Sequence, residues 1–273
     1  MVLDIILLTL SIGFAVTGSF TFWPVQFGYD FYKPIVLFIG GYVATLILLY
    51  LLYDLMGRIV GSMTKEYSRP GVFARTLFIW AIDFIDRHAR IRLTIKGRNK
   101  FPTTERFLLV CNHKSRFDSM IITQFFGKRD IAFLTKRDNM KIPLAGRLMN
   151  RICYLPLDRE DKFQSLNQMR RAEMLLKENV SSVGVFPEGT RIPDDIILGE
   201  FHEGVFNIAL KAKVPILVCI VRHTHDVQRN WPWKATHVEL NILGLIAYEE
   251  IEGKTAKDVS DEVHELMINA LQE

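Results

Sequence analysis

The chain has 273 residues, of which 49% are hydrophobic, and its mean hydropathy is +0.14. This length accommodates one core domain with an appendage, and the composition is too apolar for a purely soluble enzyme. The formal net charge of +4 suits a protein that meets anionic headgroups or an acidic donor. So small an excess gives no reason to expect a nucleic-acid partner.

The cysteines exclude a disulfide framework. Cys111, Cys153 and Cys219 each lie beside or within apolar runs, and their spacing is not that of metal ligands. We therefore expect them to be buried thiols in a reducing compartment.

Two uncharged apolar stretches lie near the N-terminus, from Ile5 to Trp23 and from Pro34 to Tyr53. Each is close to the ~20 residues that cross a bilayer as a helix, so residues 1–55 are predicted to form a membrane-anchoring helical hairpin. The connecting loop holds Lys33, whereas basic residues follow the second stretch at positions 58, 65, 69 and 75. The positive-inside rule therefore places the rest of the chain on the cytoplasmic face of the inner or plasma membrane.

Two alternatives remain for these stretches. A cleavable signal peptide requires a basic residue before its apolar region, and Asp4 stands there instead. A pair of helices that enters only one leaflet is compatible with the glycines at positions 13, 18, 28, 40 and 41 and with Pro24 and Pro34, because these residues permit kinks.

The next segment, residues 56–89, contains a predicted amphipathic helix over residues 71–88. Arg75, Asp83 and Arg87 interrupt its apolar pattern on one side. The apolar positions at helical spacing are Val72, Phe73, Leu77, Trp80, Ala81 and Phe84. This helix suits either the headgroup region of a membrane or packing on the domain's own core.

From residue 90 to 273, short β-type runs alternate with helical segments. Strands are predicted at 91–95, 107–112, 131–135, 182–186, 215–221 and 237–243, and helices at 162–178, 204–212 and 255–271. The helix at 162–178 carries five apolar residues on one face, namely Phe163, Leu166, Met169, Ala172 and Leu176. We expect an α/β fold with a mixed, mostly buried sheet flanked by helices, and with loops at strand ends that are free to carry a site.

The motif NHKSRFD follows the predicted strand at 107–112 and places His113 and Asp118 five residues apart. On a regular helix these two side chains would lie about 140° apart, so they can face one substrate only across a turn. In a strand-to-helix loop His113 can act as a general base, and Asp118 can fix its tautomer. The alternative is a surface histidine beside a helix N-cap aspartate.

A second motif, FPEGTR, ends the predicted strand at 182–186. Its Pro-Glu-Gly turn lets backbone amides approach a ligand, and the planar fork of Arg191 suits a phosphate. Glu188 either orients Arg191 through paired hydrogen bonds or contacts a substrate hydroxyl. An ordinary turn with a solvated charge pair is the alternative for the whole motif.

Together the two motifs resemble the 1-acylglycerol-3-phosphate acyltransferases, the glycerolipid acyltransferase family of the H-x4-D type. TKRDNMKIPLAGRLMNRICYLPLDR at 135–159 is similar to the second sequence block of this family, and VPILVCIV at 214–221 is similar to its fourth. The resemblance therefore extends from about residue 90 to residue 221. The N-terminal hairpin and the last fifty residues match in character only.

The resemblance implies that His113 is the catalytic base and Asp118 its partner. The implied reaction is direct transfer of a fatty acyl group from acyl-CoA or acyl carrier protein to the sn-2 hydroxyl of 1-acylglycerol-3-phosphate, which makes phosphatidic acid. No cofactor or metal is required. The chain has no G-x-S-x-G motif, and Ser115 is interpreted as a turn residue rather than a nucleophile.

The resemblance also implies a set of substrate-binding residues. These are Glu188 and Arg191 for the acceptor phosphate, Gly189 and Thr190 for the shape of the turn, and Arg159, Lys136 and Lys141 as further cations. Arg159 can equally be an exposed charge in the run from Asp158 to Asp161. Gly146 is expected to permit close packing along an acyl groove.

The chain also departs from the family. His202 and Glu203 stand where relatives often carry lysines, which puts acceptor preference in doubt. Another lysophospholipid or a lyso-aminolipid is the alternative acceptor. The cluster RHTHD at 222–226 has a metal-like composition and would serve a metal-dependent membrane hydrolase, although a loop after a strand explains it equally well. A catalytically silent lipid-binding protein is a third class, which the intact His113 and Asp118 oppose.

Overall fold

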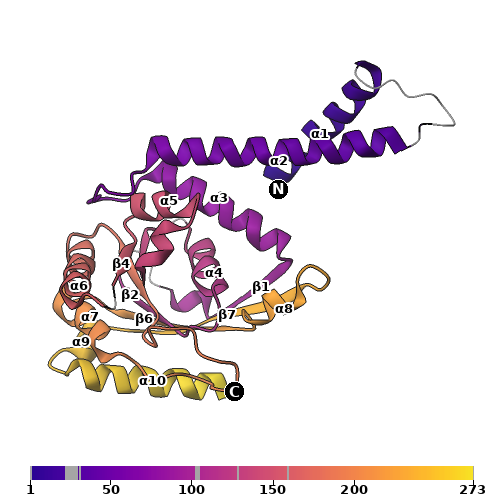
Figure 1. Cartoon of the computed structure of the whole chain (residues 1–273). Coiled ribbons are helices and arrows are strands. Elements are labelled where there is room, and N and C mark those ends of the chain that lie inside the picture. Colours follow the sequence, from indigo (N-terminus) through magenta and orange to yellow (C-terminus); the bar gives the residue numbers. More distant parts are fainter. Residues whose placement is uncertain are drawn as a thin grey trace. The chain divides into compact units, whose positions relative to one another are not determined.

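A computed structural model describes residues 2–21, 30, 32–101, 105–127, 129–158 and 160–272 (Figure 1). Contacts within the chain divide it into two compact units, Met1–Ile59 and Val60–Glu273.

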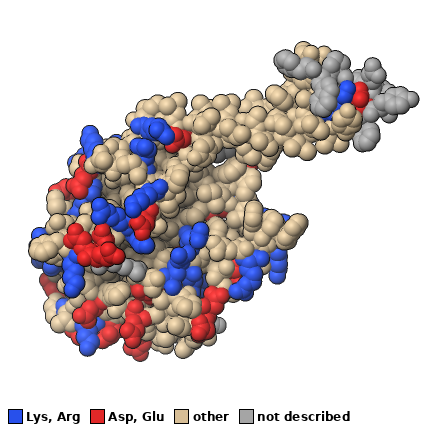
Figure 2. Space-filling view, in the orientation of Figure 1, with Lys and Arg blue, Asp and Glu red and all other residues tan. Residues whose placement is uncertain are grey.

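The first unit consists of α1 (Val2–Thr21) and α2 (Tyr32–Val60). Both helices are long and apolar enough to cross a membrane, as judged by length and composition. Figure 2 shows few charged side chains along them. Several of their hydroxyl groups bond within the helix itself: Ser11 donates to the carbonyl of Leu7 at 2.6 Å and Thr45 to that of Gly41 at 2.7 Å. The two predicted helices are therefore confirmed within the described residues.

The second unit is built on a seven-stranded sheet with the order β1-β7-β6-β2-β5-β3-β4. The strands are β1 (Ile91–Lys96), β2 (Leu108–Cys111), β3 (Ile131–Lys136), β4 (Leu155–Leu157), β5 (Ser182–Val185), β6 (Ile216–Arg222) and β7 (Thr236–Ile246). Every neighbouring pair is parallel except β6 and β7, which are antiparallel. The sheet is thus mixed, as the sequence predicts, and its central strands β2 and β5 are buried along their whole length.

Helices cover both faces of this sheet (Figure 1). They are α3 (Val72–His88), α4 (Phe117–Phe125), α5 (Ala145–Arg151), α6 (Lys162–Lys177), α7 (Asn207–Ala212), α8 (Asp226–Asn230), α9 (Tyr248–Ile251) and α10 (Ala256–Gln272), with short 3-10 turns η1 (Arg98–Lys100), η2 (Arg137–Lys141) and η3 (Glu203–Phe206). All the predicted strands and helices are present.

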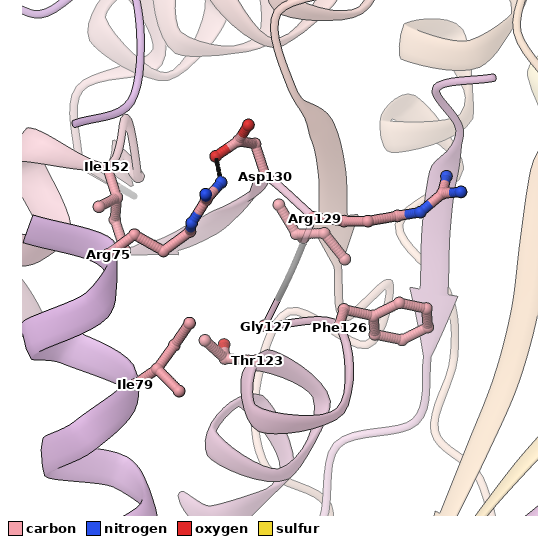
Figure 3. Close-up of a pocket in the computed structure, with 9 residues that line it drawn as sticks. Arg75, Ile79, Thr123, Phe126, Gly127, Arg129, Asp130 and Ile152 are labelled. Atoms are coloured by element: carbon pink, nitrogen blue, oxygen red, sulfur yellow. Dashed lines mark hydrogen bonds and ion pairs between the residues drawn. The ribbon is translucent and has the colours of Figure 1, made fainter. Parts of the chain in front are cut away.

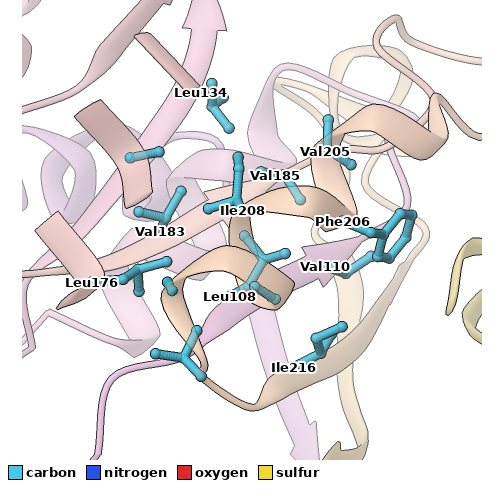
Figure 4. Close-up of a cluster of buried hydrophobic side chains, with 14 of the residues drawn as sticks. Leu108, Val110, Leu134, Leu176, Val183, Val185, Val205, Phe206, Ile208 and Ile216 are labelled. Atoms are coloured by element: carbon cyan, nitrogen blue, oxygen red, sulfur yellow. The ribbon is translucent and has the colours of Figure 1, made fainter. Parts of the chain in front are cut away.

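The main hydrophobic cluster lies between the sheet and the helices α6, α7 and α10 (Figure 4). Leu108 and Val110 of β2 belong to it, together with Phe206 and Ile208. Because side chains alternate along a strand, the intervening residues of β2 face the other layer. A strand covered on both sides cannot shift its register without exposing apolar surface, so the residue that follows β2 is held in a fixed place.

Two of the predicted helices bury only part of their apolar face. On α6 the side chain of Phe163 is 83% exposed and Leu166 is also exposed, whereas Ala172 and Leu176 are buried. The helix is anchored through its C-terminal half, and its first turns extend beyond the core. On α3 the buried residues are Ala74, Leu77, Phe78, Ile82 and Asp86, while Val72, Phe73 and Trp80 are exposed.

The three cysteines are buried and free, which confirms their predicted burial.

Candidate active site

The two sequence motifs meet at the carboxyl edge of the sheet. His113 follows β2 and Glu188 follows β5, and these strands are parallel neighbours, with Val110 opposite Val185. In an open sheet of parallel strands, the loops at the carboxyl ends form the usual ligand site. Residues that are 75 positions apart in the chain are therefore placed next to each other.

His113 and Asp118 form a dyad. The Nδ1 atom of His113 lies 2.9 Å from Oδ2 of Asp118, a carboxylate at the start of α4 with no exposed surface. The same oxygen accepts hydrogen bonds from the backbone amides of Lys114 and Ser115, each at 2.7 Å. A carboxylate with these donors holds the proton of the imidazole on Nδ1 and leaves Nε2 as the basic nitrogen. The predicted turn and the predicted pairing are both present.

Glu188 fixes the loop that carries His113. It is only 3% exposed, and its Oε2 accepts the backbone N–H of His113 at 2.5 Å while its Oε1 accepts that of Gly199 at 3.1 Å. Ile192 in turn donates its N–H to the carbonyl of His113 at 2.9 Å. The second motif and the residue that follows it thus bind both backbone groups of His113. The oxygens of Glu188 serve backbone amides, in place of the predicted pairing with Arg191.

The carboxyl group of Glu188 has an unusual acidity. Burial raises its pKa to about 7, although the hydrogen bonds from the backbone amides of Gly199 and His113 act in the opposite direction. The two amides require an acceptor, so the ionised form fits this arrangement. If Glu188 were protonated, its O–H would compete with one of these two amide N–H groups for the same carboxyl oxygen.

Two further residues support His113, and the sequence alone gave them no role. The ring of Phe186 stacks on the imidazole with centroids 4.2 Å apart and planes at 17°. Asn112, which is buried, donates to the carbonyl of Val221 at 2.9 Å and accepts the N–H of Val221 at 2.7 Å. Its side chain therefore continues the pairing of β2 with β6 beyond the strand. Asn112 and Phe186 are the first residues of the two motifs, and this position is the signal that could have identified them.

Arg191 and Thr190 line an open pocket next to the dyad. The other lining residues are Lys114, Ile192, Pro193 and Asp194. Lys114 donates through Nζ to the carbonyls of Pro193 and Ile196, which holds its charge at the pocket wall. Arg191 is exposed and forms no hydrogen bond or ion pair with a residue in the part of the chain that the structure describes. This guanidinium is therefore available to an anionic group.

Two predicted glycines occupy positions that exclude a side chain. Gly189 has φ of +66°, and a Cβ there would lie 2.7 Å from the ring of His202. At Gly146 a Cβ would lie 1.8 Å from the carbonyl oxygen of Met140, so α5 and η2 approach closely at that point. The first glycine shapes the turn after Glu188 as the sequence predicts. Close packing at Gly146 is present as well, and its role in an acyl groove stays a prediction.

The remaining predicted cations lie apart from the dyad or outside the described residues. Lys136 and Lys141 are exposed and both pair with Asp138, at 2.7 and 3.1 Å. Arg159 falls outside the described residues. Their roles in substrate binding stay predictions.

The RHTHD segment forms an ion-pair cluster at the surface. His223, His225 and Arg229 lie within 3.6 Å of Asp226, and Arg229 also lies 3.3 Å from Asp194. Among the described residues, no group of three or more His, Cys, Asp or Glu side chains is arranged to hold a metal ion.

A second, enclosed cavity of about 10 Å³ lies between α3, α4 and β3, where Arg75 forms an ion pair with Asp130 (Figure 3). Thr123, Phe126 and Ile152 are among its other lining residues. This volume holds about one water molecule. The cavity is therefore no substrate site.

Comparisons with known proteins agree with this site. A profile of the family described as Acyltransferase matches residues 92–222, which include both motifs. Mouse 1-acyl-sn-glycerol-3-phosphate acyltransferase alpha is 27% identical over 187 residues, or 67% of this chain and 65% of the mouse protein. The 1-acyl-sn-glycerol-3-phosphate acyltransferase of Haemophilus influenzae is 27% identical over 183 residues, or 66% of this chain and 75% of that protein.

This chain is similar to the acyltransferase family. It is also 29% identical to an uncharacterised acyltransferase of Schizosaccharomyces pombe over 186 residues, or 67% of this chain and 66% of the yeast protein. The chain thus spans just under two thirds of the length of the yeast and mouse relatives. The crystal structure of the LPA acyltransferase PlsC from Thermotoga maritima matches with a TM-score of 0.58 and 21% identity, over 99% of this chain and 96% of that one. The chain therefore has the PlsC-like fold.

Proposed function

We propose that this acyltransferase transfers a fatty acyl group from an acyl thioester to the sn-2 hydroxyl of 1-acylglycerol-3-phosphate. The observation that carries the proposal is the dyad itself: His113 has its Nδ1 bound to a buried carboxylate, and its backbone is held by Glu188. The names of the mouse and Haemophilus influenzae relatives support this acceptor.

In the proposed reaction Nε2 of His113 removes the proton from the acceptor hydroxyl as that oxygen attacks the thioester carbonyl. A C–O bond forms, the C–S bond breaks, and the imidazolium returns its proton to the departing thiolate. Asp118 stabilises the imidazolium, and the ring of Phe186 below it favours the charged form through its π face. No covalent acyl-enzyme is needed.

The acceptor phosphate is proposed to bind in the open pocket that Arg191 and Lys114 line. The guanidinium is exposed and planar, which suits a phosphate with two hydrogen bonds, and the pocket adjoins the loop of His113. Arg159, Lys136 and Lys141 are proposed as further cations for the acceptor or the donor. The donor is acyl-CoA or acyl carrier protein, both of which are anionic.

Residues 1–55 are proposed to anchor the enzyme, with 56–89 as the connecting segment and 90–273 as the catalytic domain. The side chains of α1 and α2 support this role, because apolar residues such as Ile5, Leu8, Ile35 and Leu51 are exposed in this unit. Exposure of these apolar side chains to water costs free energy, whereas the hydrocarbon core of a bilayer accommodates them without this cost. The basic residues after α2 favour a catalytic domain on the cytoplasmic face.

The test is an assay of purified full-length protein with a matrix of lysolipid acceptors and both donors. We expect phosphatidic acid from 1-acylglycerol-3-phosphate and a loss of about 100- to 10,000-fold in kcat for His113→Ala. The exposed His237 on β7 provides a matched control, and His237→Ala should retain full turnover. Near-normal turnover of folded His113→Ala would exclude the mechanism, and preference for a phosphate-free acceptor would exclude the substrate.

A further inference from the structure

Two tryptophans stand on the surface of the second unit, outside the two sequence motifs of the candidate active site. Trp231 and Trp233 lie on the loop between α8 and β7, where they are 56% and 87% exposed. An exposed indole is costly in water, and two in one loop call for an apolar partner. Nothing in the proposed chemistry uses them.

The loop is held rigidly against the end of α3. The indole Nε1 of Trp231 donates to the carbonyl of His88 at 3.1 Å. Arg90 donates through Nη1 to the carbonyls of Pro232 and Trp233 at 3.2 and 2.9 Å. Because these hydrogen bonds fix the loop backbone, the loop loses little conformational entropy when it binds a partner.

An apolar strip on α3 runs toward this loop. Phe73 and Trp80 are seven residues apart, which places them on one face of the helix, and both are more than half exposed. Phe84, one turn further along the same face, contacts the ring of His88 with centroids 4.0 Å apart and planes tilted by 33°. The strip therefore ends at the residue whose carbonyl receives the indole of Trp231.

The segment that leads from α3 through β1 is rich in Lys and Arg, of which Arg87 pairs with Asp83 and Lys96 with Glu239, each at 2.8 Å. Between Arg87 and Lys100 the chain carries six Lys or Arg residues and no Asp or Glu. This segment covers the end of α3, the edge strand β1 and η1, and Lys234 follows the tryptophans. Figure 2 shows Lys and Arg side chains on the side of the unit that carries β1 and α8 in Figure 1.

We infer that this surface, the aromatic-basic edge, docks the catalytic unit on an anionic lipid bilayer. The edge comprises the exposed face of α3, β1 and the loop 231–234. Tryptophan with adjacent Lys and Arg is the combination that the headgroup region favours, since the indole sits at the boundary and the cations meet lipid phosphates. The inference rests on the proposed function, in which the acceptor is itself a bilayer lipid.

The chemistry of the edge favours a lipid over a protein. Its indoles and cations occur together over several elements, and the apolar helices α1 and α2, which are long and apolar enough to cross a membrane, belong to the same chain. A surface of this composition matches the headgroup layer of a bilayer. It sets the orientation of the catalytic unit, which the apolar helices alone do not fix.

The experiment uses the full-length protein with one fluorescent label. All three native cysteines are buried, so a new surface cysteine can be labelled selectively. Lys234→Cys places an environment-sensitive NBD label beside the tryptophans, and Glu265→Cys places it on α10, which covers the opposite face of the sheet (Figure 1). Each protein is reconstituted in phosphatidylcholine vesicles with or without phosphatidylglycerol, and quenching by lipids with a nitroxide on the acyl chain is measured.

We expect strong quenching at position 234 and little at position 265, with a further increase when phosphatidylglycerol is present. Replacement of both tryptophans by alanine should reduce quenching at 234 at least twofold. Arg92→Glu should abolish the dependence on phosphatidylglycerol, whereas Lys257→Glu on α10 should preserve it. Equal quenching at 234 and 265 would overturn the inference. So would a label at 234 that is already shielded in detergent, because another part of the chain or a second copy would then cover the edge.

Acyl transfer to a short-chain, water-soluble acceptor separates the two proposals. The double tryptophan variant should retain full turnover on this acceptor and lose rate only on long-chain acceptor in vesicles. Absence of quenching in a fully active enzyme would refute the docking surface and leave the proposed function unaffected. Absence of acyl transfer by the unaltered chain refutes the proposed function, whatever the quenching shows.

Discussion

The carboxylate of Glu188 accepts the backbone N–H of His113, so the second motif positions the first through the main chain. The same carboxylate accepts the N–H of Gly199. Replacement by glutamine turns one of its two acceptors into a donor that faces an amide. We expect Glu188→Gln to lower kcat by at least about tenfold, with a smaller change in the acceptor KM, because an unmade buried hydrogen bond costs about 1–3 kcal/mol. An acceptor KM effect without a kcat effect would instead place Glu188 on the phosphate.

The raised pKa of Glu188 predicts opposite trends for activity and stability. Its pKa is about 7 in the folded protein and 4.5 in the ordinary state, so the folded state binds this proton more tightly. The resulting stabilisation is complete below about pH 4.5 and is lost as pH rises through 7. Activity needs the ionised form and should fall as pH drops below about 7. Glu188→Gln should flatten the pH dependence of Tm between pH 5 and 8, and an unchanged slope would contradict the assignment.

Asp86 on α3 also has a raised pKa, and because it lies outside the candidate site it offers a test of stability alone. It is 3% exposed, neither carboxylate oxygen has a hydrogen-bond partner among the described residues, and burial together with Asp83 raises its pKa to about 7. At pH 8 the folded protein must hold an unpaired buried charge. We expect Asp86→Asn to raise Tm by several degrees at pH 8 and by much less at pH 4.5. Exposed Asp138→Asn, measured in parallel, should show no such pH-dependent gain.

Asp118 fixes the imidazole of His113 and two backbone amides with one oxygen. Asparagine is neutral and cannot stabilise the imidazolium, so we expect Asp118→Asn to lower kcat by about 100-fold or more and to leave a measurable remainder. Single-turnover rates check this, with circular dichroism as the folding control. Turnover as low as that of His113→Ala would mean that the histidine is misplaced in the variant.

Arg191 is exposed beside the pocket, so its replacement should not disturb the fold. Lysine retains the charge and loses the planar fork. We expect Arg191→Lys to raise the acceptor KM several-fold and to leave the donor KM within about twofold. Initial rates with each substrate varied in turn decide the matter, and an effect on the donor alone would assign Arg191 to the thioester side.

Gly189 and His202 form a pair that can be tested by a double mutant. Gly189→Ala places a residue with a Cβ at φ of +66°, which costs about 1–2 kcal/mol, and adds a contact of 2.7 Å with the His202 ring. Combination with His202→Ala removes the contact and leaves the backbone cost. Tm should therefore fall most in the single variant and recover in part in the double. Additive losses would mean that the two residues do not touch.

Much of the fold follows from apolar periodicity, and the exceptions have physical causes. Long apolar runs such as that at 215–221 predict buried strands because only a covered strand tolerates them. The strand β4 was not predicted, since Leu155–Leu157 is three residues long and contains Pro156, which cannot donate to a partner strand. The exposure of Phe163 was also missed, because spacing gives the face of a helix and says nothing about where the core ends.

In the candidate site, the contact between two side chains was predictable from the sequence, whereas the contacts of side chains with the backbone were not. The pairing of His113 with Asp118 follows from their spacing and residue types. The role of Glu188 did not follow, because its partners are main-chain amides. Nearly every residue carries such an amide, so the sequence does not distinguish these two. The same holds for Asn112, whose side chain replaces one backbone pair between two strands.

The position of β2 in the sheet has a consequence for biosynthesis. This strand lies between β5 and β6, which the ribosome makes later, and the loop of His113 depends on contacts 75 and 109 residues further along the chain. At about 5–20 residues per second, the last of these contacts emerges some 5–20 s after the histidine. In a nascent chain the loop of His113 therefore lacks these contacts until Val221 has been made. Products of translation that stalls before this point accordingly cannot hold the histidine in its folded position.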